Sequence, residues 1–289
     1  MLLRNTPIHT WLLTLTAMCA FAGNSLLCRW ALKETSIDPV SFTVIRIASG
    51  AIALSLIQRF RKSTQLGAGN WTSAFALFIY MAAFSYAYIG LPTGTGAFLL
   101  FGAVQLTMIL AGLWGGERFK LKQSLGFVIA SAGLAWLLLP STSTPPIKES
   151  SLMLIAGVAW AIYSLRGQSA LDPIAVTSSN FMRAAAFAVG FSLMFIFSAK
   201  VDGSGCLLAV TSGVLTSGIG YTVWYSVLPK LKTTDAAVVQ LSVPVIATIA
   251  GTILLSETIT DRLVFASMAT LMGVGIVIFN KNKGQKYER

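Results

Sequence analysis

The chain has 289 residues, of which 55% are hydrophobic and only 11% are charged, and its mean hydropathy is +0.74. An ordinary soluble domain carries about 25% charged residues, so this chain lacks the polar side chains that a water-exposed surface needs. A formal net charge of +11 is compatible with nucleic-acid binding, but the positions of the basic residues give it another meaning.

Apolar segments fill the sequence, and they are long enough to cross a ~30 Å hydrocarbon core as helices. We predict ten such spans, at approximately residues 10–31, 40–58, 72–90, 95–115, 122–139, 151–169, 174–197, 205–227, 235–255 and 262–280. The sequence therefore predicts an all-α polytopic membrane protein.

The basic residues are distributed unequally between the two sides of these spans. If both termini lie on one side, that side receives fourteen of the 21 basic residues and the other side five, while Arg46 and Arg183 fall inside spans. Short loops rich in Lys and Arg stay in the cytoplasm. We therefore expect a multi-pass protein of a bacterial inner membrane with both termini cytoplasmic. The protein is then expected to lie in the lipid bilayer, and it is not expected to bind nucleic acid.

The first two spans each contain a polar residue within an apolar run. Asn24 lies in the first, and Arg46 lies seven residues beyond Pro39 in the second, which is roughly 10 Å along a helix. Polar groups inside a bilayer must be paired or face a wet cavity. Both side chains are expected to point inward, and a plain helix–helix hydrogen bond is the alternative role for Asn24.

Two helical hairpins of similar design stand out, at residues 86–117 and 221–257. Each has a Tyr early, a Leu-Pro at its turn, an apolar run and a Glu at its end, namely Glu117 and Glu257. We expect the two hairpins to line one working centre.

The sequence predicts that the chain consists of two similar halves. The Pro/Ser/Thr-rich residues 141–150 form a predicted linker between repeats at 1–140 and 151–280, and residues 281–289 form a basic cytoplasmic tail. Asp-Pro precedes the second span of each half, which contains Arg46 or Arg183. Each half holds five spans, an odd number, so the second half must be inverted. Inverted repeats around a central cavity suit alternating access.

The inversion suggests two pairs of opposite charge. It places Arg46 and Glu257 toward the periplasm, and Arg183 and Glu117 toward the cytoplasm. We hypothesise that each Arg associates with its Glu as a gate. Static structural pairing, or a separate neighbour for each residue, is the alternative.

The candidate substrate-binding residues are polar or aromatic residues of the spans that are expected to face inward: Asn24, Arg46, Tyr86, Gln105, Trp160, Tyr163, Arg183, Tyr221 and Gln240. With two buried cations they suggest a cavity for a small organic solute, with carboxylate-bearing solutes included.

Catalytic chemistry has little support in the sequence. It shows no His/Cys/carboxylate cluster with metal spacing and no P-loop, so neither a catalytic residue nor a metal nor a cofactor is predicted. The acids lie in loops or near span ends. Strong proton coupling is therefore not indicated, and facilitated export or exchange fits at least as well.

Three features resemble the EamA-repeat branch of the drug/metabolite transporter superfamily: the paired five-span halves, the Pro followed by an inward Arg, and the dipeptides Gly116-Glu117 and Ser256-Glu257 that close the fourth spans. The resemblance implies ten helices, inverted repeats, a central cavity and export of amino acids, metabolites or drugs. The family's Pro within the fourth span matches Pro244 in the second half but Val104 in the first.

The sequence thus favours an exporter rather than an enzyme. One alternative is a nucleotide-sugar or lipid-carrier translocase of the same superfamily. Another is a membrane enzyme or non-transporting sensor, which a dry, closed centre would favour over a cavity lined by Arg46, Tyr86, Trp160 and Arg183. The oligomeric state, a monomer included, is left open.

Overall fold

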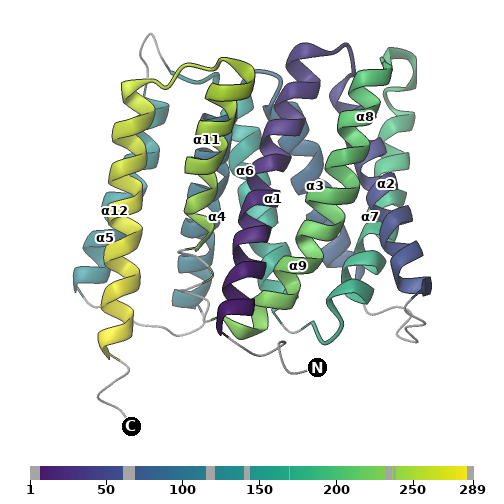
Figure 1. Ribbon diagram of the computed structural model, residues 1–289. Helices are drawn as coiled ribbons and strands as arrows, with labels where there is room; N and C mark the ends of the chain where they lie inside the picture. The colour runs from purple at the N-terminus through teal and green to yellow at the C-terminus, as the bar shows by residue number, and fades with distance from the viewer. Residues whose placement is uncertain are drawn as a thin grey trace.

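The computed structural model describes residues 7–60, 69–114, 121–139, 144–168, 170–231, 236 and 239–284. Within these ranges the long regular elements are helices: α1 (Pro7–Glu34), α2 (Pro39–Phe60), α3 (Trp71–Ala87), α4 (Thr93–Trp114), α5 (Leu121–Leu138), α6 (Ile147–Gly167), α7 (Pro173–Leu193), α8 (Gly203–Thr211), a π-helical segment (Ser212–Ile219), α9 (Gly220–Val227), α11 (Ser242–Leu255) and α12 (Asp261–Gly284). They stand side by side in one bundle (Figure 1).

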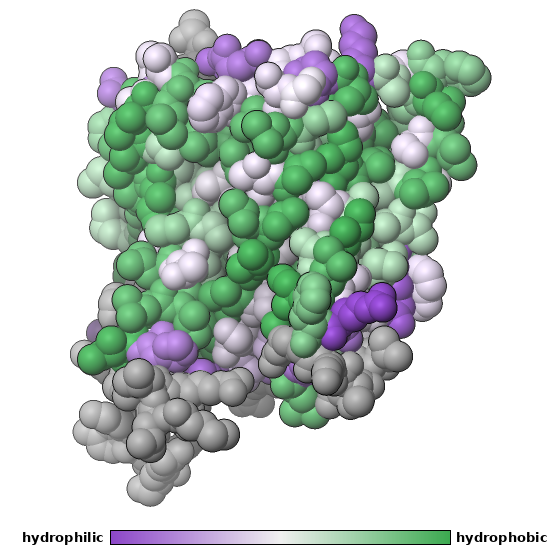
Figure 2. Space-filling view, turned by 45° about the vertical axis from the view of Figure 1, so that its right-hand side comes forward, coloured by the Kyte–Doolittle hydropathy of each residue, from purple (hydrophilic) through white to green (hydrophobic). Residues whose placement is uncertain are grey.

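Helix α8, the π segment and α9 follow one another as a single span, so the described helices make up the ten predicted spans. Five spans are long and apolar enough to cross a membrane, and three further apolar helices are shorter. Hydrophobic side chains cover the middle of the visible face, and hydrophilic ones gather toward its two ends (Figure 2). The chain is a polytopic helical membrane protein, as its composition predicts.

Helix neighbours occur in matched sets across the two halves. Helix α3 packs on α6 and α7, and its counterpart α8–π–α9 packs on α1 and α2; likewise α4 packs on α6, and α11 packs on α1. The remaining major contacts join counterparts to each other, α2 with α7, α4 with α11 and α5 with α12. Helix α1 begins and helix α12 ends at the same end of the bundle, and α6 begins at the opposite end (Figure 1). This is the arrangement that two inverted five-helix halves produce.

The two Asp-Pro dipeptides start equivalent helices. Asp38 accepts hydrogen bonds from the backbone N–H groups of Val40 and Ser41 at the start of α2, and Asp172 caps α7 in the same way. An Asp cap followed by Pro is a favoured helix start. Partial burial alone would raise the pKa of Asp38, but hydrogen bonds from Ser41, from the Lys200 N–H and from Val40 outweigh it and lower that pKa. The cap is therefore ionised, and it joins α2 to the segment before α8.

Candidate functional site

A network of polar side chains lies inside the bundle, with Arg46 of α2 at its centre. Arg46 is fully buried. Its Nε donates to the Ser217 hydroxyl at 2.9 Å, and its Nη2 donates to the hydroxyls of Tyr221 at 2.7 Å and Tyr80 at 3.4 Å. The two tyrosine hydroxyls are 2.9 Å apart. We call Arg46, Tyr80, Ser217, Tyr221 and Asn24 the central network.

Asn24 of α1 also belongs to this network. Its amide nitrogen donates to the Tyr80 hydroxyl at 3.1 Å, and its amide oxygen accepts from Ser212 at 2.7 Å and from Thr216 at 3.2 Å. Both hydroxyl donors belong to the π segment, as does Ser217. A π-helical turn widens the helix, and such turns are frequent at functional sites. Here it presents three hydroxyls to one asparagine.

Aromatic rings enclose the central network on one side. The Phe21 ring packs edge-on against Trp160 at 5.2 Å and against Trp224 at 5.7 Å between centroids. Trp160 in turn lies 4.7 Å from Tyr221, and its indole N–H donates to the amide oxygen of Gln240 at 3.2 Å. We call Phe21, Trp160, Tyr221 and Trp224 the aromatic layer. Helices α1, α6, α9 and the start of the ninth span therefore meet here.

The structure brings six predicted residues into one connected set: Asn24, Arg46, Trp160, Tyr163, Tyr221 and Gln240. Tyr163 belongs to it through its ring, which lies 5.7 Å from that of Trp160. Gln105 is also fully buried, on α4. Both hairpins contribute, because Phe101 of the first stacks on Phe21 at 6.3 Å while the second supplies Tyr221 and Gln240.

Tyr86 was predicted at the centre but lies outside it. Its ring is half-buried against Phe191, 6.3 Å away, whereas Tyr80 of the same helix occupies the centre. Six residues turn an α-helix through about 600°, which leaves the two side chains about 120° apart. A tyrosine hydroxyl in the middle of the apolar stretch FIYM was the signal for Tyr80.

Arg183 is the second predicted residue that lies elsewhere. Its guanidinium lies over the Trp71 ring at 5.8 Å and donates to Ser179, and the side chain is half-buried. It follows Pro173 by ten residues, whereas Arg46 follows Pro39 by seven. The position that matches Arg46 is Asn180, whose amide oxygen accepts from the Asn70 N–H at 3.1 Å. The predicted equivalence of the two arginines is therefore wrong.

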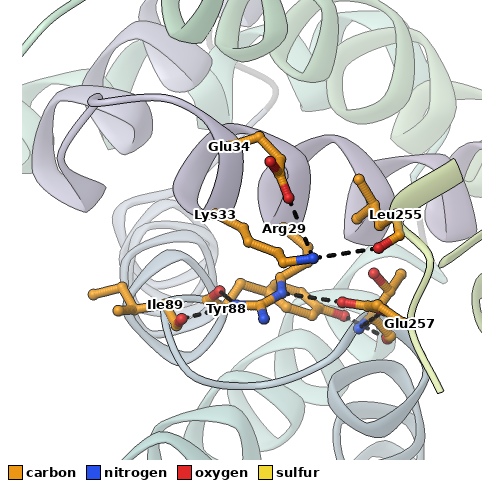
Figure 3. A network of polar contacts seen from close by, with 8 residues as sticks. Arg29, Lys33, Glu34, Tyr88, Ile89, Leu255 and Glu257 are labelled. Carbon is orange, nitrogen blue, oxygen red and sulfur yellow. Dashed lines mark hydrogen bonds and ion pairs between the residues drawn. The ribbon is translucent and has the colours of Figure 1, made fainter. Parts of the chain in front are cut away.

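Glu257 pairs with Arg29, not with Arg46 as hypothesised. The Arg29 Nε lies 3.1 Å from the Glu257 carboxylate, and Arg29 also donates to the backbone oxygens of Tyr88 and Ile89 (Figure 3). The other carboxylate oxygen accepts from the Thr93 N–H at 2.7 Å. We call Arg29 and Glu257 the latch. It ties the end of α1 to the α3–α4 turn and to the segment that follows α11. Glu117 lies outside the described residues, so its pairing with Arg183 stays a prediction.

Ser256 explains why Glu257 turns toward α1. It ends α11 in the left-handed backbone region, with φ of 51°, and is the one described non-glycine residue with positive φ. The Glu257 N–H donates back to the Gly251 carbonyl at 3.2 Å, which is a common way for a helix to end. The cap therefore directs the carboxylate across the bundle end.

The centre is closed in this conformation. The side chains of the central network and of Trp160 are each at most 4% exposed. The expected cavity lined jointly by Arg46, Tyr86, Trp160 and Arg183 is not formed, because Tyr86 and Arg183 lie elsewhere. A cavity of about 430 Å³ does lie between α3 and α6, and its lining is apolar, with Phe75, Ile79 and Ile162 among its residues.

Comparison with known proteins agrees with this architecture. The model of the EamA-like transporter family matches residues 10–139 and again residues 147–279. An uncharacterised protein of Pseudomonas aeruginosa is 52% identical over 271 residues, covering 93% of this chain and 94% of its own. Proteins of Salmonella typhimurium and Escherichia coli named as probable amino-acid metabolite efflux pumps are each 25% identical over 72% of this chain and 74% of their own. A solved crystal structure matches 98% of this chain and 100% of its own with a TM-score of 0.68 at 16% identity, and so shares the fold.

Proposed function

The chain belongs to the EamA-like transporter family, and from this premise we propose that it exports a small organic solute across the bacterial inner membrane by alternating access. The observation that supports this most is the composition of the central network. Asn24, Arg46 and Tyr80 come from the first half, and Ser217 and Tyr221 come from the second. A site shared by two inverted halves is exposed to alternate sides when the halves rock against each other.

The basic residues at the bundle ends support the proposed orientation. Arg59, Arg166 and Lys230 end α2, α6 and the eighth span. These helix ends lie at the end of the bundle where α1 begins and α12 ends (Figure 1). The positive-inside rule places this side in the cytoplasm. The latch then lies at the periplasmic end.

The latch is the proposed periplasmic gate. It joins three segments that must separate for the centre to open at that end: the end of α1, the α3–α4 turn and the segment that follows α11. Lys33 adds a contact to the Leu255 carbonyl at 3.3 Å. An outward-open state requires that these contacts break, and the closed centre corresponds to an occluded state of the transport cycle.

The closed centre by itself would favour a membrane enzyme or a non-transporting sensor. Two features favour transport. The centre is polar, with a charged arginine and six hydrogen-bonding side chains from both halves. The family and the named relatives are transporters. Among the described residues no Asp or Glu contacts the central network, so facilitated export or exchange is the proposed mode.

The proposal is tested by counterflow in proteoliposomes loaded with candidate solutes, using labelled amino acids and related metabolites outside. We expect the protein to accelerate exchange of at least one solute. Tyr221→Phe removes an acceptor of a charged hydrogen bond, so exchange should slow about 10-fold. Tyr86→Phe, outside the centre, is the matched control and should exchange at the original rate. No accelerated exchange of any solute, or equal rates for the two variants, would contradict the proposal.

A further inference from the structure

We propose that the transported solute is a monocarboxylate with an apolar body, and that Arg46 binds its carboxylate. The inference rests on the proposed function and adds a substrate class to it.

Arg46 is a buried cation, and no carboxylate among the described residues pairs with it. Its hydrogen-bond partners are the neutral hydroxyls of Ser217, Tyr221 and Tyr80. The ion pairs that join two described residues are Arg29 with Glu257 and Lys33 with Glu34, and neither includes Arg46. Removing a charge from water costs several kcal/mol unless an opposite charge compensates it. Because burial of this charge is costly, we infer that an anion from outside the protein binds to Arg46.

Two buried N–H donors near the centre have no acceptor among the described residues. One is Nη1 of Arg46, and the other is the indole nitrogen of Trp224. Both residues are fully buried. Buried donors are nearly always satisfied in folded proteins, and these two call for acceptor atoms. A carboxylate supplies acceptors only, and the planar guanidinium can bind it through two parallel hydrogen bonds.

The count of charges limits the anion to one negative charge. Arg183, the other arginine predicted at the centre, instead lies over Trp71. No described Asp or Glu stands at the centre to receive an ammonium group. A monocarboxylate without an amine therefore neutralises the site, whereas a zwitterionic amino acid leaves it with its original net charge. A doubly charged anion would leave an excess negative charge.

The aromatic side chains around Arg46 indicate the chemical nature of the rest of the solute. The Arg46 guanidinium lies 5.1 Å from the Phe84 ring centroid. Tyr221, which accepts a hydrogen bond from Arg46, packs on Trp160 in the aromatic layer. Aromatic faces and edges favour an apolar or aromatic body. The carboxylate would then lie at Arg46 and the body along the aromatic layer.

The test compares ligands of one skeleton on purified protein by calorimetry or thermal shift: 3-phenylpropionate, phenylalanine and 3-phenylpropionamide. We expect 3-phenylpropionate to bind more tightly than phenylalanine, and tighter binding of phenylalanine would contradict the monocarboxylate class. The amide, which keeps the size and loses the charge, should bind about 100-fold more weakly, the upper range for a charged hydrogen bond. Equal binding of acid and amide, or no binding of any carboxylate, would overturn the inference.

The arginine variants assign the effect to Arg46. Arg46→Lys keeps the charge but not the planar fork, and binding should weaken about 10-fold. Arg46→Met should abolish binding, while the ligand-free protein should melt at the same temperature or higher because an uncompensated charge is removed. Arg183→Met is the control and should bind normally. Unchanged affinity in Arg46→Met would refute the assignment, and Arg46→Lys covers the case in which Arg46→Met fails to fold.

Two further arms separate the possible outcomes. If chloride stabilises the protein through Arg46 and 3-phenylpropionate does no more than chloride at equal concentration, the site takes any small anion and the monocarboxylate class is wrong. If counterflow proceeds with uncharged or cationic solutes and is insensitive to Arg46→Lys, the inference fails while the proposed function stands. If no solute is exchanged, the proposed function itself fails.

Discussion

Glu257→Ala should lower the free energy of unfolding by about 3 kcal/mol, the cost of removing one partner of a buried ion pair. The Arg29 and Glu257 side chains are only 12% and 10% exposed, so the remaining guanidinium would keep its charge without a counter-ion. The Thr93 N–H would also lose its acceptor. Denaturant titration of the purified protein, followed by tryptophan fluorescence, measures the change.

The neighbouring pair Lys33–Glu34 is the matched control. It is similar in length, 3.2 Å against 3.1 Å, but its side chains are 35% and 48% exposed (Figure 3). Exposed pairs contribute between zero and about 1 kcal/mol, so Glu34→Ala should have little effect. In the double variant Arg29→Met/Glu257→Ala the cost should fall below that of Glu257→Ala alone. Equal losses for Glu257→Ala and Glu34→Ala would mean that the latch holds nothing together.

Gly213→Ala should destabilise the protein by about 1–3 kcal/mol, the range for overpacking a core, and should abolish transport. Helix α2 lies so close to the π segment at this point that an added Cβ would stand 2.2 Å from the Arg46 carbonyl oxygen and 2.1 Å from the Ser49 hydroxyl. Backbone cannot yield as a side-chain tip can. The two elements must move apart, and Arg46 moves away from Ser217 and Tyr221.

Gly190→Ala on α7 is the control for this substitution. A Cβ at Gly190 meets no atom within 4 Å, and alanine is the better helix former by up to about 1 kcal/mol. The variant should be as stable as the parent or more so, and it should transport normally. Melting temperatures and counterflow rates of the two variants provide the comparison. If Gly213→Ala behaves like Gly190→Ala, then close contact between α2 and the π segment is unimportant.

The spans and their inverted order could be predicted because they depend on simple properties of the sequence. Long apolar runs specify membrane helices, and an odd number of spans per half forces the inversion. The Asp-Pro starts at Asp38 and Asp172 are local signals, and the structure shows both as caps. Asn24 and Arg46 were also predictable, because a polar group in an apolar span must face inward.

Other parts of the site depend on the rotation of each helix, which the sequence does not state. Tyr80 and Tyr86 are both plausible inward residues, and only packing against α6 and α9 selects Tyr80. Arg183 lies three residues beyond the position that matches Arg46. The low similarity between the two halves does not reveal this shift. The π segment has no apolar signature that distinguishes it from an α-helix.

The partner of Glu257 could not be predicted because it follows from the end of a helix. Arg46 and Glu257 are predicted at a similar depth in the membrane, which is why Arg46 is the expected partner. The left-handed conformation of Ser256 turns the carboxylate toward the end of α1, where Arg29 already binds the carbonyls of Tyr88 and Ile89. In the gating hypothesis the glutamate is therefore still Glu257, but the arginine is Arg29 and not Arg46.

The most direct test of alternating access is counterflow through the double variant Arg29→Cys/Glu257→Cys, joined by a short, cleavable bifunctional thiol reagent. The native Cys19, Cys28 and Cys206 are first replaced by alanine. The account predicts that cross-linking the latch positions stops exchange, that cleavage restores it, and that single variants treated with the reagent keep exchanging. Exchange at an undiminished rate in the fully cross-linked protein would contradict it.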